Sequence, residues 1–181
     1  MNKPRAVPVD DGFLIEQVRR GSEKAFQVLY KRHARYIAGV AYRILGNDAD
    51  LDDIVQDTFV TAARKIGQLK EPEHARLWLT TIAVRLTKKR LKLRGRLKLR
   101  GLGLASEADR HADPRILSRL DDLREALGRM PEKLTTPWIL HRVEGMTIKE
   151  SAAACGVSTA TVKRRLSSAE AKLRRRIDVD G

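Results

Sequence analysis

Hydroxyl and basic side chains recur along one face of a helix expected at residues 158–177. Side chains of these types donate hydrogen bonds and attract anions, so they suit contact with phosphates and base edges. The set comprises Thr159, Thr161, Lys163, Arg164, Ser167 and Ser168. The other face carries apolar residues at helical spacing, namely Val162, Leu166, Ala169, Leu173 and Ile177. A helix with these two faces is narrow enough to enter the major groove of DNA.

The residues before this helix predict a second helix and a turn. Gly145 can end a preceding helix, and Thr147 with Glu150 forms a capping box that starts the next one. Gly156 supplies the backbone freedom of a sharp turn, and Ser158 is a good N-cap. Residues 144–177 therefore predict a helix-turn-helix. Spacing alone leaves open an ordinary helical hairpin whose basic face is merely solvated.

The charge balance favours a polyanionic partner. The 181 residues include 37 Lys and Arg against 23 Asp and Glu, which gives a net charge of +14 and a pI near 10.4. Nucleic acid is the first candidate and a membrane surface the second. We expect a cytoplasmic protein, because the sequence has no apolar run of about 18 residues and no signal peptide at its start.

Metal, cofactor and disulfide chemistry are not expected. Cys155 is the only cysteine, so we interpret it as a small buried residue of the turn. The four histidines, His33, His74, His111 and His141, lack the spacing of metal ligands.

An acidic face is expected on a helix at residues 50–66. Asp50, Asp53 and Asp57 lie at helical spacing, with Asp52 and Gln56 beside them. The helix dipole favours acids in the first turn, but Asp57 lies about two turns in, and like charges one turn apart repel. A docking face for a basic protein partner therefore stands beside the purely structural interpretation.

A basic track is expected on a helix at residues 74–93. One of its faces is apolar and includes Trp78, which we interpret as a core residue. The neighbouring face is suited to phosphate contacts and carries Arg76, Thr80, Thr81, Arg85, Lys88, Lys89 and Lys92.

The apolar periodicity predicts an all-α protein of two small helical domains. We expect a loose tail at residues 1–10, a first domain at 11–94, a flexible basic linker at 95–113 and a second domain at 114–181. The segment RLKLRG occurs twice, at residues 90–95 and 96–101, and its glycines argue against a stable helix throughout. We assign the repeat no role. Pro137 is expected in the first turn of a helix at 138–144.

Five segments together resemble the extracytoplasmic-function (ECF) sigma factors, small bacterial initiation factors of the sigma-70 family. The segments are LYKRH, RILGNDADLDDIVQDTF and ARLWLTTIA in the first domain, and LREALGRMPEK and HRVEGMTIKESAAACGVSTATVKRRL in the second. The resemblance spans about residues 11–176 and implies sigma regions 2 and 4 in that order.

The resemblance also implies partners. Asp52, Asp53, Gln56 and Asp57 would dock on the clamp helices of the polymerase β′ subunit, and region 4 would meet the β flap. Minus-ten contacts would come from Arg76, Thr80, Thr81, Arg85, Lys88 and Lys89. Minus-thirty-five contacts would come from Thr159, Thr161, Lys163, Arg164, Ser167 and Ser168. An anti-sigma factor, often at the inner membrane, would hold the protein inactive away from the nucleoid. No small-molecule substrate is implied.

The sequence departs from the family pattern at several positions. Val84-Arg85 stands where the family often has Arg-Asn, and Ser168 and Glu170 stand where basic residues are frequent. The alternative function is a stand-alone helix-turn-helix regulator, which leaves the acidic face without a task. An enzyme acting on nucleic acid is disfavoured, because the acids have no nearby histidine or glycine-rich phosphate loop.

Overall fold

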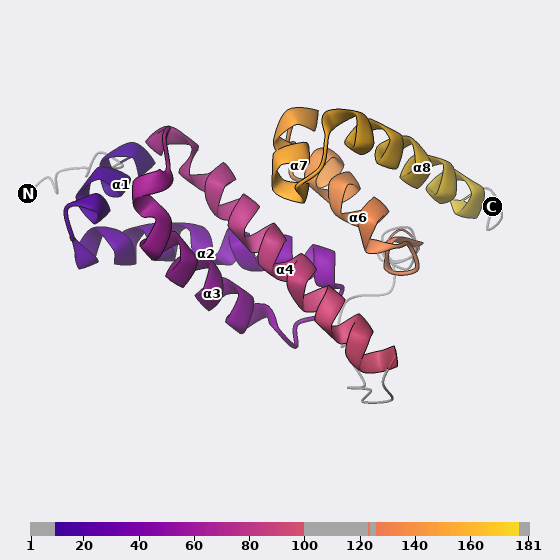
Figure 1. Ribbon diagram of the computed structural model, residues 1–181, viewed down its shortest axis with the longest axis horizontal. Helices are drawn as coiled ribbons and strands as arrows, with labels where there is room; N and C mark the ends of the chain where they lie inside the picture. The colour runs from indigo at the N-terminus through magenta and orange to yellow at the C-terminus, as the bar shows by residue number, and fades with distance from the viewer. Residues whose placement is uncertain (1–9, 100–122, 124–125, 178–181) are drawn as a thin grey trace, which may run out of the picture.

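The computed structural model describes residues 10–99, 123 and 126–177, and within these residues every regular element is helical (Figure 1). The all-α prediction is confirmed for this part of the chain. The expected tail at 1–9, the linker from residue 100, the start of the second domain and His111 lie outside it.

The first domain consists of four main helices. They are α1 (Asp11–Arg19), α2 (Glu23–Leu45), α3 (Leu51–Lys65) and α4 (Ala75–Leu99), with short 3₁₀ turns at Ile66–Gln68 and Pro72–His74. Ser22 caps α2 by accepting a hydrogen bond from the Ala25 amide, and Gly46 ends that helix with a left-handed φ of 76°. Side chains of α2, α3 and α4 form the core, including Ile37, Phe59 and Leu79.

Helix α4 is longer than predicted. The sequence suggested that glycine would interrupt the helix near residue 95, but the backbone remains helical to Leu99. A glycine inside a helix costs only about 1 kcal/mol relative to alanine. Contacts from the preceding turn offset this cost, since Arg94 pairs with Asp50 and its Nη1 donates to Asn47 Oδ1 at 3.0 Å. The first RLKLRG copy thus ties α4 to the start of α3.

The second domain contains α6 (Glu132–Trp138), a π-helical turn (Ile139–Val143), α7 (Ile148–Cys155) and α8 (Thr159–Ile177). The prediction for Pro137 was wrong, because this residue lies buried inside α6 and does not start a helix. Its ring removes one helical hydrogen bond, and the wider π turn that follows is a typical accommodation of a disrupted helix. The turn closes through the Glu144 amide, which donates to the Ile139 carbonyl at 3.0 Å.

The helix-turn-helix formed by α7 and α8 agrees with the sequence prediction. Thr147 and Glu150 form the capping box, and Gly156 adopts a left-handed φ of 68°. Ser158 Oγ accepts from the Thr161 amide at 3.2 Å. Along α8 the predicted apolar residues Val162, Leu166, Ala169 and Leu173 are buried.

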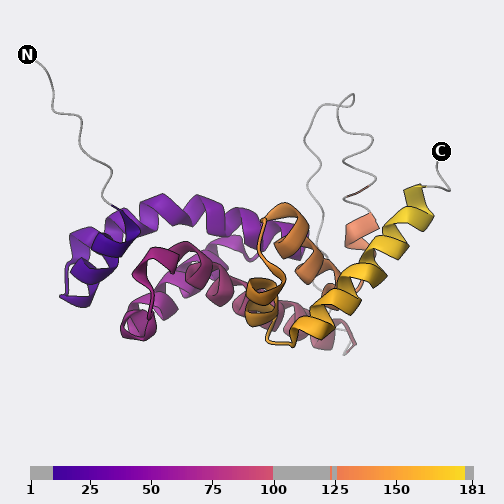
Figure 2. The same ribbon diagram turned by 90° about the horizontal axis from the view of Figure 1, so that it is seen from above.

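The two domains pack directly against each other. Figure 2 shows the second domain beside the first, and α7 contacts α4 while α6 contacts α2. Helix α4 is consequently covered on two sides, by α2 and α3 within its own domain and by α7 of the other.

Candidate protein and nucleic-acid interfaces

The acidic face of α3 is open to solvent. Asp52, Asp53, Gln56 and Asp57 are all exposed, whereas Ile54 and Val55 between them are buried. Asp53 is 66% exposed, and its Oδ2 lies 3.5 Å from Arg90 Nη2 of α4. The helical period thus brings all four predicted docking residues to one surface.

An apolar groove of about 520 Å³ lies beside this acidic face, between α2 and α3. Asp52 and Gln56 line it together with apolar residues that were not predicted to form part of a binding surface. These are Phe26, Tyr30, Val55, Phe59 and Val60. Tyr30 and Val60 remain 42% and 41% exposed. An exposed apolar patch with a polar rim is typical of a protein interface.

The signal for this groove was present in the sequence. Tyr30 is exposed and stands among polar residues, outside the buried stripe of α2. Tyr30 packs on Phe59 with ring centroids 4.7 Å apart, so the two helices share the floor of the groove.

The basic track on α4 is only partly accessible. Arg76 is exposed and stacks on the Tyr36 ring at 4.2 Å, and Lys89 is also exposed. Thr81 is half-buried and donates to the Leu77 carbonyl at 3.0 Å. Thr80, however, is only 1% exposed, and its hydroxyl donates to the Arg76 carbonyl at 2.8 Å.

Two further members of the track contact the second domain, although Arg85 is exposed and Lys88 is half-buried. Arg85 Nη2 donates to the Ala153 carbonyl at 3.3 Å, and Lys88 Nζ donates to the Cys155 carbonyl at 2.8 Å. Lys88 also lies 3.8 Å from a Glu132 carboxylate oxygen. Val84, one of the departures from the family pattern, is fully buried beneath the second domain.

The recognition helix α8 presents most of its predicted set. Thr159, Lys163, Arg164, Ser167 and Ser168 are exposed. Thr161 is half-buried, and its hydroxyl lies 2.9 Å from Ser158 Oγ at the helix start. The serine hydroxyls donate to carbonyls four residues back, as polar residues inside helices often do.

The structure gives Glu170 a role that the sequence pattern did not suggest. Its Oε1 accepts from Arg142 Nε at 3.1 Å, which links α8 to the π turn. The negative charge of Glu170 on the recognition helix is therefore paired with the positive charge of Arg142.

No metal site and no membrane-spanning helix occur among the described residues. Cys155 is buried at 6% exposure, as expected. Burial raises the pKa of its thiol, and the nearby Lys88 ammonium opposes that shift only in part.

The fold combines a helix-turn-helix with a second helical domain that carries an exposed acidic face. Comparison with protein families makes the class specific: the model of Sigma-70 region 2 matches residues 29–97, and that of Sigma-70, region 4 matches residues 120–173. The ECF RNA polymerase sigma-E factor of Haemophilus influenzae is 26% identical over 95% of this chain and 97% of its own length.

Solved structures agree with this class. CnrH in complex with the cytosolic domain of CnrY is 28% identical, with a TM-score of 0.67 over 94% of this chain and 99% of that one. Sigma factor RpoE in complex with the anti-sigma factor NepR from Bartonella quintana shares the fold, at 24% identity and a TM-score of 0.71 over 87% and 99% of the two chains. The chain belongs to the sigma-70 family, in its ECF group. Membership favours a promoter-directing sigma factor over a stand-alone regulator.

Proposed function

We propose that this protein is a non-catalytic subunit that binds core RNA polymerase and directs initiation at specific promoters. The observation that carries the proposal is the pairing, in one domain, of an exposed acidic face on α3 with a basic track on α4. A stand-alone regulator needs only the helix-turn-helix and leaves that pair without a task. A polymerase subunit uses both.

The core-binding face comprises Asp52, Asp53, Gln56 and Asp57 together with the apolar groove beside them. The carboxylates attract a basic surface and set its orientation, while the half-exposed Tyr30 and Val60 supply apolar area at the centre. The partner surface proposed is that of the β′ clamp helices. Region 4 would meet the β flap.

The promoter contacts divide between the domains. Arg76, Thr81, Arg85, Lys88 and Lys89 would hold the minus-ten strand, with Thr80 supporting the helix from within. The exposed residues of α8 would read the minus-thirty-five element, and the hydroxyl of Thr161 would fix the start of that helix. Lys163 and Arg164 lie in its first turns, where a docked helix reaches base edges.

A protein partner that holds the sigma factor inactive is part of the proposal. CnrH and RpoE were each solved with a bound protein, and NepR is described as an anti-sigma factor. We propose a partner of this kind here, and a protein that works in the cytoplasm at the nucleoid when released.

Removal of the acidic charges tests this assignment. Asp53→Ala with Asp57→Ala should weaken binding to core polymerase about tenfold, because two charges of the docking face are lost. Binding of a minus-thirty-five duplex should be unchanged. Glu23→Ala with Asp48→Ala removes two exposed acids elsewhere in the same domain and serves as the control. Equal losses in both binding assays would mean that the acidic face is structural.

A further inference from the structure

The loop that joins α3 to α4, residues 66–74, lies against α1 (Figure 1). Leu69 of this α3–α4 loop is only 5% exposed and belongs to one apolar cluster with Leu14 and Ile15 of α1. Ile66 packs on the same cluster. The loop therefore has a packed side, which faces α1, and an open side.

The Arg19 guanidinium ties the last turn of α1 to the backbone of this loop. Its Nε donates to the Ile66 carbonyl at 3.3 Å, and its Nη2 donates to the Leu69 carbonyl. Its Nη1 donates to Glu16 Oε1 one turn earlier in α1, which holds the arginine side chain in place. The planar fork of an arginine suits several acceptors at fixed directions, whereas a lysine offers one nitrogen on a flexible stem. Arg19 thus fixes two carbonyls of the loop at once.

The open side of the loop carries side chains that can contact nucleic acid. Gln68 and Lys70 flank the buried Leu69, and both are exposed. An amide donates and accepts hydrogen bonds, so it can recognise a base edge, and an ammonium pairs with phosphate. Arg76, an exposed member of the proposed minus-ten track, follows in the first turn of α4. The loop thereby extends that track beyond the start of the helix.

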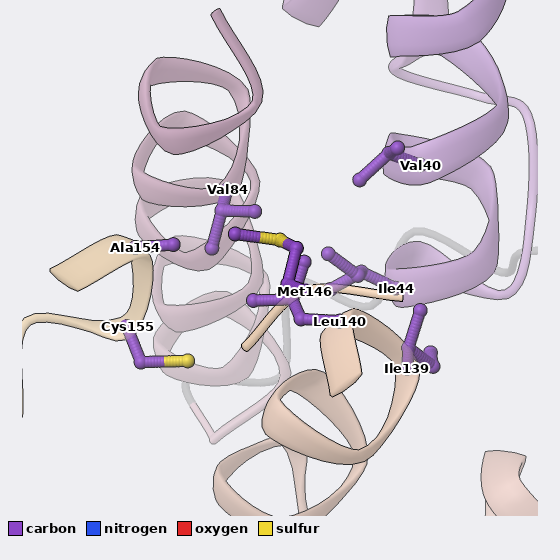
Figure 3. Close-up of a cluster of buried hydrophobic side chains, with 8 residues drawn as sticks. All are labelled: Val40, Ile44, Val84, Ile139, Leu140, Met146, Ala154 and Cys155. Carbon is purple, nitrogen blue, oxygen red and sulfur yellow. The ribbon is translucent and has the colours of Figure 1, made fainter. Parts of the chain in front are cut away.

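The contacts with the second domain lie farther along α4. Val84 belongs to the apolar cluster between the domains (Figure 3), and Arg85 and Lys88 bind carbonyls of α7. These residues come eight to twelve positions after Arg76, or roughly 12 to 18 Å along the helix axis at 1.5 Å per residue. The start of α4 and the open side of the loop remain accessible to a DNA strand.

We propose that Arg19 is a positioning residue for single-strand recognition: it holds the α3–α4 loop so that Gln68 and Lys70 meet the strand. The role of the loop in minus-ten binding rests on the proposed function, whereas the hydrogen bonds from Arg19 do not. A loop that is already held loses less conformational freedom on binding. Hydrogen bonds to a base edge also depend on direction, so a displaced loop loses discrimination between bases.

A purely structural role for Arg19 gives a different expectation. A variant that only unfolds more easily has a smaller active fraction, which lowers the apparent affinity for every oligonucleotide by the same factor. The ratio between two affinities then stays constant. A positioning role changes that ratio, so the ratio separates the two roles.

Hydrogen exchange on the full chain tests the hold on the loop. Arg19→Gln should raise exchange in peptides that cover residues 66–74 about fivefold, as expected for the loss of one net hydrogen bond. Arg19→Lys should do the same, because it keeps the charge but not the fork. Arg20→Gln changes the next, exposed arginine and should leave the loop as it is. Unchanged exchange in both Arg19 variants would overturn the proposal.

Binding of single strands tests the role in recognition. The probes are fluorescent 10-mers of dA, dC and dT, which the wild-type chain should bind with unequal Kd values. Arg19→Gln and Arg19→Lys should each reduce the ratio of weakest to strongest Kd at least about threefold, and Arg20→Gln should preserve it. Circular dichroism checks that each variant is folded. Equal binding of the three probes by the wild-type chain, or a retained ratio in the Arg19 variants, would overturn the proposal.

Two controls show whether Arg19 acts through the loop. In a Gln68→Ala background, Arg19→Gln should reduce the Kd ratio no further, because the side chain that it positions is absent. The log–log salt slope should be the same in Arg19→Lys as in the wild-type chain and should fall by less than about 0.7 in Arg19→Gln, the share of one phosphate contact on a single strand. A further loss of discrimination in the Gln68→Ala background, or a full fall in slope, would make Arg19 a direct contact and overturn the positioning role. These assays use no polymerase, so failure of the proposed sigma function would appear separately, in binding to core polymerase.

Discussion

The continuity of α4 through Gly95 makes a sharp prediction about stability. Gly95 is exposed, its φ is not positive, and a Cβ built on it meets no atom within 4 Å. Alanine is favoured over glycine inside a helix by roughly 0.5 to 1 kcal/mol. Gly95→Ala should therefore raise the free energy of unfolding by about that amount, or the Tm by about 1 to 4 °C.

Gly46 provides the opposite control. It ends α2 with a φ of 76°, and it also has no atom within 4 Å of a built Cβ. Both sites therefore have room for an added Cβ, and the two glycines differ in backbone conformation. A left-handed conformation costs a residue with a Cβ about 1 to 2 kcal/mol, so Gly46→Ala should lower the free energy of unfolding.

Urea denaturation followed by circular dichroism measures both variants. The refuting result is a neutral or destabilising Gly95→Ala, since a helix that ended before residue 95 would gain nothing from alanine. A helix that ended earlier would also not hold Arg94 in contact with Asp50 and Asn47.

Three further predictions concern the second domain. Thr147→Ala should lower the free energy of unfolding by about 1 kcal/mol, because it removes the capping box of α7; an unchanged urea midpoint would contradict this. Glu170→Gln should tighten binding to duplex DNA, because it removes a negative charge from the recognition helix and frees Arg142. The free energy of unfolding should fall by less than about 1 kcal/mol. Weaker binding in a fluorescence titration would contradict this prediction. The pH midpoint for alkylation of Cys155 should lie higher in the native chain than in urea, because burial raises the pKa of the thiol. The stability linked to that thiol is then present below its ordinary pKa and lost as pH rises through the folded value; a native midpoint at or below that in urea would contradict this.

The local structure could largely be predicted from the sequence. Ser22, Thr147 with Glu150, and Gly156 mark helix ends because caps and left-handed glycines act within a few residues. The apolar stripe of α8 likewise follows from a period that needs no knowledge of the partner surface.

The contacts between the domains could not be predicted in this way. Lys88 and Cys155 are 67 residues apart, and the acceptor is a backbone carbonyl, which has no sequence signature. Thr80 was expected on the basic face, but it is buried, and its hydroxyl donates to the Arg76 carbonyl within α4. Pro137 was misplaced because the π turn that accommodates it depends on the packing around it.

Transcription in vitro with purified core polymerase tests the central claim most directly. The template is genomic DNA of the organism, and the 5′ ends of the transcripts are sequenced. The wild-type chain should direct initiation to a defined set of start sites with shared upstream sequences, and Asp53→Ala with Asp57→Ala should reduce this activity about tenfold. A folded chain that stimulates no initiation on any template, yet binds operator DNA without polymerase, would contradict it.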